Sequence, residues 1–356
     1  MLNIVDRIKL SIKTHETHMQ RCLELAVKGL GKVSPNPMVG CVIVCNEQII
    51  AEGYHEYYGG FHAEPNAIKQ VSDELFHKCT LYVNLEPCSH HGKTPPCADL
   101  IISKGIKKVV VGNLDSNPLV AGKGIQKLKD AGIEVVHGIL DKECRELNKR
   151  FFTFHKKKRP YIILKWAQTA DGFISHWPLP ENREDNWITG KESKVLVHQW
   201  RSEEQAILVG YNTLMADDPR LTTRLVQGKN PVRLVMARHA GLPANLHIFN
   251  KEAETIIFND NSSDKKSNVE FVKIDWTNKA QQVLDYCFKN NIASIIVEGG
   301  TNTIYNFMNL NAWDEARVFV NPDKKFEHGI SAPEVQLNLL APQKVGNDLL
   351  YTFLNK

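Results

Sequence analysis

No apolar run in this 356-residue sequence approaches the ~18–20 residues that a membrane span requires. The opening segment, MLNIVDRIKLSIKTHETH, has neither an apolar core nor a small-residue cleavage site, so it does not resemble a signal peptide. Without a secretion signal, the eight cysteines suit thiols and metal ligands better than a disulfide framework. These absences predict a cytoplasmic protein without a membrane partner.

A strong excess of one charge is also missing. The formal net charge of +4 falls short of what a dedicated nucleic-acid binder usually carries, and a phosphorylated small substrate suits it as well. The apolar fraction of 42% and the charged fraction of 24% are ordinary for a globular protein. At about 100–200 residues per domain, the length predicts two domains or more.

The sequence further lacks a G-x-G-x-x-G segment between a predicted strand and a helix, so a Rossmann dinucleotide site is not indicated. The nearest candidate, GLGKVS at 29–34, has neither the third glycine nor the preceding strand. Any dinucleotide would therefore have to bind through a different loop.

Apolar periodicity in the first half predicts alternating helices and strands. This alternation favours a sheet with helices on both faces. The expected helices are 16–30, a helix starting at 62, another starting at 97, and 122–132, and the expected strands are two within 39–55, then 80–87, 107–115 and 133–140.

The segment HKKKRP at 155–160 is basic and ends in proline, which favours a solvated linker over a nucleic-acid patch. We therefore expect domains at 1–155 and 160–356. The second half is again α/β, without internal repeat of the first. Its expected helices are 193–204, 279–290 and 301–310, and its expected strands are 161–167, 206–210, 232–237, 255–259, 293–300 and 315–320.

Three candidate metal ligands follow one another in the first half: His62, Cys88 and Cys97. His62 stands where a loop containing Gly59-Gly60 enters a predicted helix, and Cys88 follows a predicted buried strand. One imidazole and two thiolates leave the fourth tetrahedral position of a zinc ion open, as a catalytic site requires. Zinc held in this way acidifies bound water enough to give a nucleophile near neutral pH.

Glu64 lies two residues after His62, at the start of the same predicted helix. From there a carboxylate can reach both the water and an aromatic ring, and can move protons between them. Zinc deaminases use this H-x-E…P-C…C order, with the glutamate as acid and base. A structural zinc site, with His90 or His91 as fourth ligand, is the alternative interpretation.

The segment between the two cysteines, LEPCSHHGKTPPC at 85–97, gives C-x8-C instead of the C-x-x-C typical of nucleic-acid and nucleoside deaminases. Together with SPNPMVGCVIV (34–44), GYH (53–55) and NPLVAGKGI (117–125), it closely resembles the bifunctional deaminase–reductases of riboflavin biosynthesis. The resemblance covers nearly the whole chain. It implies an N-terminal cytidine-deaminase-like three-layer α/β/α domain and a C-terminal dihydrofolate-reductase-like α/β domain.

The resemblance also implies the chemistry. The N-terminal domain would use zinc to deaminate 2,5-diamino-6-ribosylamino-4(3H)-pyrimidinone 5′-phosphate. The C-terminal domain would then use NADPH to reduce the ribosyl side chain to ribityl, with hydride delivered by the cofactor. The expected partner is a small phosphorylated pyrimidine, without nucleic acid, and self-association as a homo-oligomer is compatible with the family.

Four further residues match deaminase positions of the family. Asn36 and His55 resemble residues that contact the pyrimidine or ribose, and His90 and Lys93 resemble residues placed for the phosphate and sugar. A lysine is a suitable point-charge partner for a phosphate. Asn36 could instead serve only its turn, and His55 only a strand end. Pro65 departs from the usual β-branched residue but suits a first helical turn.

In the second half, VEGGTNT (297–303) indicates a strand that ends in two glycines and enters a helix. The free N–H groups of that helix suit a cofactor pyrophosphate, although a plain strand–helix turn has the same pattern. The resemblance implies NADPH contacts at Gly299, Gly300, Thr301, Asn302, Thr303, Ile304, Tyr305 and Asn306, and at Ala167, Trp187, Thr213 and Asp217. It implies substrate contacts at Lys165, Asp185, Arg201, Leu221, Arg224 and Glu298.

Three departures affect this half. Ala237-Arg238 replaces an expected aspartate and small or basic residue, Asp185 stands where serine is common, and 321–335 lacks the usual hydrophobic pattern. An acidic Asp185 would repel a phosphate.

Two competing interpretations remain. One is a zinc deaminase acting on another nucleotide or nucleic-acid base, with a degenerate C-terminal nucleotide-binding module. The other is a non-enzymatic protein with a structural zinc.

Overall fold

The chain divides into two compact units, Met1–Lys158 and Arg159–Lys356. Helix α6 (Lys149–Lys157) extends into the basic segment 155–160, which we expected to be a solvated linker, and residues 156–158 of this segment are exposed. No described helix is both long and apolar enough to cross a bilayer. The computed structural model describes residues 4–89, 95–116, 121–239, 241–335 and 340–355.

Helices and strands alternate along most of the first unit, as the periodicity predicted. Its first helix begins earlier and ends earlier than the predicted 16–30, and the helices at 141–157 were not predicted from their largely charged sequence. The elements are α1 (Ile4–Val27), β1 (Gly40–Cys45), β2 (Gln48–Tyr54), α2 (Ala63–Ile68), η1 (Asp73–Lys78), β3 (Cys79–Leu85), α3 (Cys97–Ser103), β4 (Lys108–Asn113), α4 (Lys123–Asp130), β5 (Glu134–His137), α5 (Asp141–Leu147) and α6.

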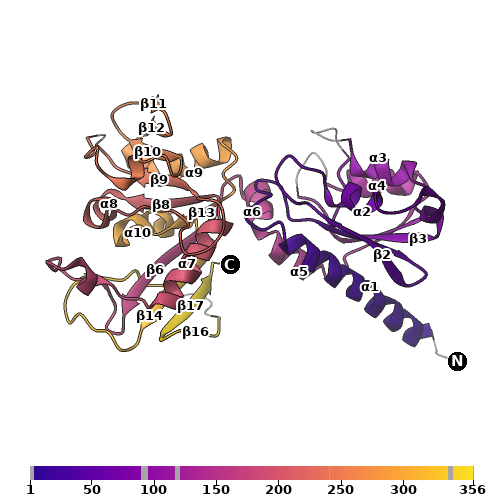
Figure 1. Ribbon diagram of the computed structural model, residues 1–356, viewed down its shortest axis with the longest axis horizontal. Coiled ribbons are helices and arrows are strands. Elements are labelled where there is room, and N and C mark those ends of the chain that lie inside the picture. The colour runs from indigo at the N-terminus through magenta and orange to yellow at the C-terminus, as the bar shows by residue number, and fades with distance from the viewer. Residues whose placement is uncertain (1–3, 90–94, 117–120, 240, 336–339, 356) are drawn as a thin grey trace. The chain divides into compact units, whose positions relative to one another are not determined.

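The described strands of this unit form a five-stranded sheet in the order β2-β1-β3-β4-β5, with β3, β4 and β5 parallel. Successive side chains of β1 alternate between its faces. Cys41 and Ile43 pack with α2, α3 and α4, whereas Val42 and Val44 pack with α1 and α5. Figure 1 shows these helices on opposite sides of the sheet, which is the three-layer α/β/α arrangement expected from the resemblance.

The second unit begins with a long strand and again alternates strands with helices. The polar segment 264–273 forms two strands that its sequence did not predict. The elements are β6 (Tyr161–Thr169), β7 (Phe173–Ser175), η2 (Arg183–Asn186), α7 (Lys191–Glu203), β8 (Ala206–Gly210), α8 (Tyr211–Asp217), β9 (Val232–Met236), η3 (His247–Phe249), β10 (Thr255–Asn259), β11 (Asp264–Lys266), β12 (Val269–Lys273), η4 (Trp276–Asn278), α9 (Lys279–Lys289), β13 (Ser294–Val297), α10 (Thr301–Asn309), β14 (Glu315–Asn321), β15 (Ile330–Ser331), β16 (Gln343–Val345) and β17 (Asp348–Leu354).

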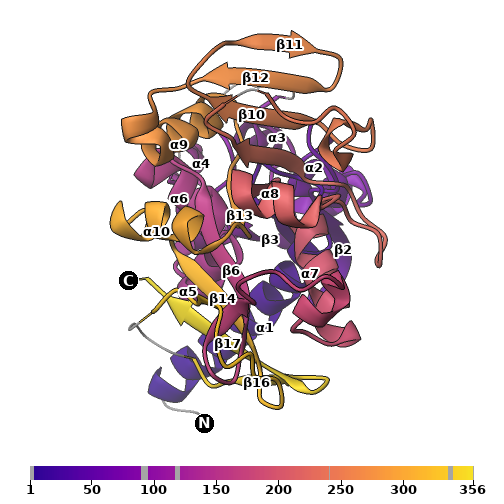
Figure 2. The same cartoon turned by 90° about the vertical axis from the view of Figure 1, so that its left-hand side faces the viewer.

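Its described strands form a ten-stranded sheet, ordered β11-β12-β10-β9-β8-β13-β6-β14-β17-β16, and a separate pair β15-β7. The seven adjacent strands β12-β10-β9-β8-β13-β6-β14 are parallel to one another, so their carboxyl ends share one edge. Leu208 packs on the face covered by α9 and α10, and Val209 packs on the face where α8 lies. Figure 2 shows α9 and α10 on one side of these strands and α7 and α8 on the other.

A buried ion pair ties the first residue of this unit to its sheet. Both terminal nitrogens of Arg159 donate to the Asp314 carboxylate, at 2.5 and 2.9 Å. One of these carboxylate oxygens also accepts the backbone N–H of Ile162 at 2.9 Å. The two charged side chains are only 11% and 6% exposed, so each depends on the other for compensation of its charge.

We predict that Asp314→Ala lowers the free energy of unfolding of the second unit by about 3–5 kcal/mol, because it leaves the Arg159 charge buried and unpaired. Urea denaturation followed by tryptophan fluorescence measures this change. Arg238→Ala is the matched control, since its ion pair with Asp260 is largely exposed and should contribute only ~0–1 kcal/mol. Equal losses in the two variants would contradict the prediction.

Candidate functional site

Three side chains meet at one end of the first sheet. The ligating atoms of His62, Cys88 and Cys97 all lie within 4.8 Å of one another. The Nδ1 atom of His62 is 3.6 Å from the Cys88 sulfur and 3.3 Å from the Cys97 sulfur. Ligands about 2.0–2.3 Å from a tetrahedral zinc ion are spaced by roughly these distances, so the cluster fits zinc in size and in donor chemistry.

Three different elements bring these ligands together. His62 immediately precedes α2, Cys88 follows β3, and Cys97 is the first residue of α3. Helix α2 lies directly against β2, because a Cβ atom on Gly53 would be 2.5 Å from the carbonyl oxygen of Ala63. The sulfur of Cys88 also accepts the backbone N–H of Cys97 at 3.3 Å. A hydrogen bond from the Cys97 thiol lowers the pKa of Cys88 to about 4, so Cys88 is poised to bind metal as the thiolate.

The carboxyl group of Glu64 lies next to this cluster in the first turn of α2. Its side chain is 3% exposed, and its Oε2 atom has no hydrogen-bond partner among the described residues. Burial raises the pKa of Glu64, which favours the protonated form. A buried carboxyl oxygen without a partner, beside a three-ligand cluster, is suited to exchanging protons with a bound molecule.

Asn36 and His55 adjoin the same cluster. The carbonyl of Phe61 can only accept, so Nδ1–H of His55 donates to it at 2.9 Å. The other ring nitrogen of His55 then accepts from the Asn36 amide at 3.1 Å. Burial lowers the pKa of His55, so the ring is neutral at pH 7. Its centroid is 5.4 Å from that of His62, and both predicted substrate residues therefore lie beside the metal ligands.

Two other predicted deaminase residues, His90 and Lys93, lie outside the described residues, as does His91. Sequence reasoning missed a further polar residue of this region, Glu86. Its buried carboxylate accepts four backbone N–H groups, although nothing in the motif except its place before Pro87-Cys88 indicated a role.

In the second unit, Lys165, Arg201 and Glu298 form a buried charged cluster. Arg201 donates to one oxygen of Glu298 at 2.8 Å, and the Lys165 amine lies 4.0 Å from the other. Burial opposes ionisation of Glu298, but the charges of Arg201 and Lys165 lower its pKa to about 2. The Nε atom of Arg201 and the Oε1 atom of Glu298 are buried without a hydrogen-bond partner among the described residues, so the cluster has unused polar atoms.

Leu221 and Arg224 belong to the segment that adjoins this cluster. Arg201 donates to the carbonyl of Thr222 at 3.4 Å, and the Arg224 side chain donates to the hydroxyl of Thr222 at 3.0 Å. Leu221 is buried with a φ of 54°. Asp185 lies elsewhere: it is exposed in η2, and its described contacts are with Asn182 and Lys324.

The two glycines after β13 pack against α8 and the residue before it. A Cβ atom on Gly299 would lie 2.7 Å from the Gly210 nitrogen, and the N–H of Gly300 donates to the Thr213 hydroxyl at 2.8 Å. Gly300 directly precedes α10, as the VEGGTNT pattern predicted. The N–H of Thr303 donates to the Gly300 carbonyl at 2.8 Å, so the N–H groups of Thr301 and Asn302 are the ones suited to a ligand. The predicted cofactor residues Thr301, Asn302, Thr303, Ile304, Tyr305 and Asn306 all lie on α10.

The remaining predicted cofactor residues lie on three other parts of this unit. Thr213 and Asp217 lie on α8, and Ala167 lies on β6, three residues beyond the Leu164 that pairs with Val297. Trp187 is separate from this group in the described contacts. Its ring is 53% exposed and faces the Lys194 amine at 3.8 Å.

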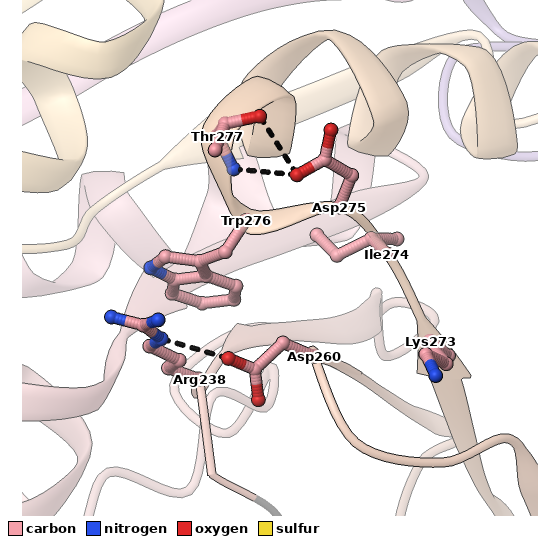
Figure 3. A pocket seen from close by; sticks show the side chains of 7 residues that line it. All are labelled: Arg238, Asp260, Lys273, Ile274, Asp275, Trp276 and Thr277. Carbon is pink, nitrogen blue, oxygen red and sulfur yellow. Dashed lines mark hydrogen bonds and ion pairs between the residues drawn. The ribbon is translucent and has the colours of Figure 1, made fainter.

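Figure 3 shows a pocket at the carboxyl ends of β9, β10 and β12. Arg238 donates to Asp260 at 2.8 Å beside the indole of Trp276, and Asp275 accepts from Thr277. None of the predicted site residues lines this pocket. Its lining residues are Arg238, Asp260, Lys273, Ile274, Asp275, Trp276 and Thr277.

Comparison with known families agrees with both units. Residues 12–113 match the cytidine and deoxycytidylate deaminase zinc-binding region, and residues 160–323 match the RibD C-terminal domain. Zinc and NADPH are the cofactors of these two domains, and the cluster of His62, Cys88 and Cys97 is a possible metal site. The match of the second unit gives no support to a degenerate module on an unrelated deaminase.

Relatives that match over nearly the whole chain belong to the same family as the two domain matches indicate. Riboflavin biosynthesis protein RibD of Actinobacillus pleuropneumoniae is 38% identical over 95% of this chain and 94% of its own length. The corresponding protein of Aquifex aeolicus is 39% identical over 95% of this chain and 98% of its own length. A crystal structure of a diaminohydroxyphosphoribosylaminopyrimidine deaminase/5-amino-6-(5-phosphoribosylamino)uracil reductase from Thermotoga maritima has a TM-score of 0.87, with 37% identity over 97% of this chain and 99% of that one. The chain belongs to the RibD family of riboflavin biosynthesis and is a bifunctional enzyme with a deaminase unit and a reductase unit.

Proposed function

We propose that the first unit deaminates 2,5-diamino-6-ribosylamino-4(3H)-pyrimidinone 5′-phosphate and that the second unit reduces the ribosyl side chain of the product with NADPH. The observation that carries the first step is the position of Glu64, whose unpartnered, buried carboxyl oxygen adjoins a cluster that fits zinc. The named activities of the Thermotoga maritima relative support this choice of substrates.

In the deamination, His62, Cys88 and Cys97 hold the metal, which when bound acidifies a water molecule for attack on the ring carbon. The ionised carboxylate of Glu64 would accept one proton of the attacking water and pass it to the ring nitrogen. It would then carry the second proton of that water to the amino group, which leaves as ammonia as the ring carbonyl forms. Because the His55 tautomer is fixed, Nε2 of His55 accepts from the Asn36 amide and holds it in one orientation. This pair is suited to contact one edge of the pyrimidine.

In the reduction, α10 holds the cofactor pyrophosphate at its N-terminus, and the buried cluster of Lys165, Arg201 and Glu298 receives the substrate. The unused polar atoms of Arg201 and Glu298 support this assignment, because a bound ligand would satisfy them. Arg201 and Arg224 are suited to the substrate phosphate. The protein thereby holds the reacting carbon against the nicotinamide, and the hydride comes from the cofactor.

We further propose that the enzyme works in a reducing compartment, the cytoplasm, on a small phosphorylated pyrimidine and without nucleic acid. The eight cysteines, all within the described residues, are free thiols. Two of them, Cys88 and Cys97, must stay reduced to bind zinc. Self-association as a homo-oligomer remains part of the proposal.

We predict that Glu64→Gln lowers deamination by at least ~10²–10⁴-fold while the protein keeps one zinc per chain, since the amide cannot accept and return a proton. Ammonia release measures the activity, and atomic absorption measures the metal. The exposed Glu74→Gln is the matched control. Deamination retained by zinc-loaded Glu64→Gln protein would show that another group moves the protons.

Gly299→Ala should weaken NADPH binding by at least about tenfold, because its new methyl group would meet backbone nitrogen 2.7 Å away and displace the start of α10. Isothermal titration with NADPH measures this affinity, and ammonia release should be unchanged. Gly241→Ala is the control, since a Cβ atom there would have no neighbour within 4 Å. Unchanged NADPH affinity in Gly299→Ala would contradict the assignment of the cofactor to this helix end.

The stability of the second unit should also depend on pH through His198, whose Nδ1 accepts the backbone N–H of Arg224. Burial, reinforced by the charges of Arg201 and Arg224, lowers the pKa of His198 to about 4. The unfolded chain takes up this proton near pH 6.5, so the free energy of unfolding falls as the pH falls from about 6.5 to 4. Urea denaturation across this range should show a smaller pH dependence in His198→Gln. The exposed His328→Gln should retain the wild-type dependence, and identical curves for all three proteins would contradict this assignment.

A further inference from the structure

We propose that Glu86 is a positioning residue of the deaminase site, whose buried carboxylate holds the chain before Cys88 against the start of α4 and so fixes the Cys88 sulfur for the metal. This inference rests on the proposed assignment of His62, Cys88 and Cys97 as metal ligands. Glu86 acts through the backbone of its neighbours and not by contact with substrate or metal.

Each oxygen of the Glu86 carboxylate accepts two backbone N–H groups. Oε1 accepts from Gly124 at 2.9 Å and from Ile125 at 3.2 Å. Oε2 accepts from Gly122 at 2.9 Å and from Asp115 at 3.2 Å. The residue is 3% exposed, so these donors replace the water that would otherwise surround its charge. The carboxylate therefore joins the end of β3 to both sides of the loop between β4 and α4.

The N-terminus of α4 lacks a capping side chain of its own, and this carboxylate takes its place. The first N–H groups of a helix have no partner within the helix, and a side chain at the N-cap usually satisfies one of them. Here the N-cap is Gly122, which has no side chain to do so. Glu86 supplies the missing acceptor from a different segment, and its negative charge suits the helix N-terminus. A structural role for α4 follows directly, but the contacts extend further.

The same contacts reach the metal ligand through Pro87. A Cβ atom on Gly124 would lie 2.0 Å from the carbonyl oxygen of Pro87, so α4 begins in direct contact with the residue before Cys88. On the other side, the Cys88 carbonyl accepts the N–H of Ala98 at 3.1 Å, and its sulfur accepts the N–H of Cys97. Cys88 is thus held between α3 and α4, and Glu86 maintains the α4 side.

Metal ligands tolerate little displacement, because metal–ligand distances in working sites fall within about 0.2 Å of their ideal values. Groups that orient a ligand without touching the metal typically change metal affinity by about 10–100-fold when they are removed. We therefore expect the loss of Glu86 acceptors to weaken zinc binding by this factor, and to change the ligand field at the metal.

The first test is Glu86→Gln in the full-length protein. The amide is nearly isosteric, but its nitrogen cannot accept, so two of the four N–H donors lose their partner. Competition with a chelator should give a zinc affinity about 10–100-fold below wild type. The visible spectrum of the cobalt(II)-loaded protein should shift in its d–d and thiolate-to-metal bands. Unchanged zinc affinity and an unchanged cobalt spectrum would overturn the proposal.

Gly124→Ala tests the same contact without removing the carboxylate. Alanine suits the helical backbone at this position, so the displaced Pro87 carbonyl is the expected consequence. The same Cβ atom would lie 3.2 Å from Glu86 Oε1, so this variant should lose zinc affinity and shift the cobalt spectrum although the carboxylate charge is kept. Wild-type behaviour of Gly124→Ala would contradict positioning through Pro87.

Phe76→Leu is the matched control for lost stability, because Phe76 is fully buried in the core of the same unit without contact to Glu86 in the described interactions. It should lower the melting temperature and leave the cobalt spectrum unchanged. If it shifts the spectrum as far as Glu86→Gln does, the effect is general destabilisation and the proposal is wrong. Wild-type protein that binds no zinc would instead contradict the ligand assignment itself, and with it this inference.

Discussion

Parallel strands that lie side by side end at the same edge of their sheet, and the loops that follow them are forced to share that edge. In the first unit, β3 and β4 are such neighbours: Cys88 follows one, and the loop held by Glu86 follows the other. In the second unit, β8 and β13 are such neighbours, and Thr213 and Gly300 meet beyond their ends. Both candidate sites depend on this constraint, although their chemistry is unrelated.

Each site also keeps polar atoms buried without a partner, which is costly in a folded protein. Glu64 has such an atom beside the zinc ligands, and Arg201 and Glu298 have such atoms in the reductase cluster. The ion pair of Arg159 and Asp314 is different, because hydrogen bonds compensate both charges within the protein. Buried atoms without a partner also occur away from the two sites, on Arg233, Arg317 and Asp348, so such an atom supports a ligand assignment only beside other site residues.

The sequence predicted that His62, Cys88 and Cys97 would lie together, because residue type and order alone indicate such a cluster. Few sites other than zinc sites combine an H-x-E segment with two following cysteines. It also predicted the alternation of strands and helices, since apolar periodicity is local. It did not predict β11 and β12, whose mostly polar residues carry little periodicity, and it missed Glu86. The partners of Glu86 are backbone N–H groups some 30 to 40 positions away, which every residue type except proline offers, so no side-chain pattern marks them.

The two departures that favoured a degenerate second unit gain a physical interpretation from their positions. Ala237 is fully buried in the core under η3, where a small apolar residue packs without cost. Asp185 is exposed, with no described contact to Lys165, Arg201 or Glu298, so its charge does not enter the cluster. If the reductase function had been lost, we would expect substitutions among Lys165, Arg201 and Glu298. Buried charges without full compensation destabilise the fold, and only binding of a ligand would keep them under selection. Arg201 and Glu298 keep their 2.8 Å contact and their unused atoms, which agrees with the proposal that this cluster receives the substrate.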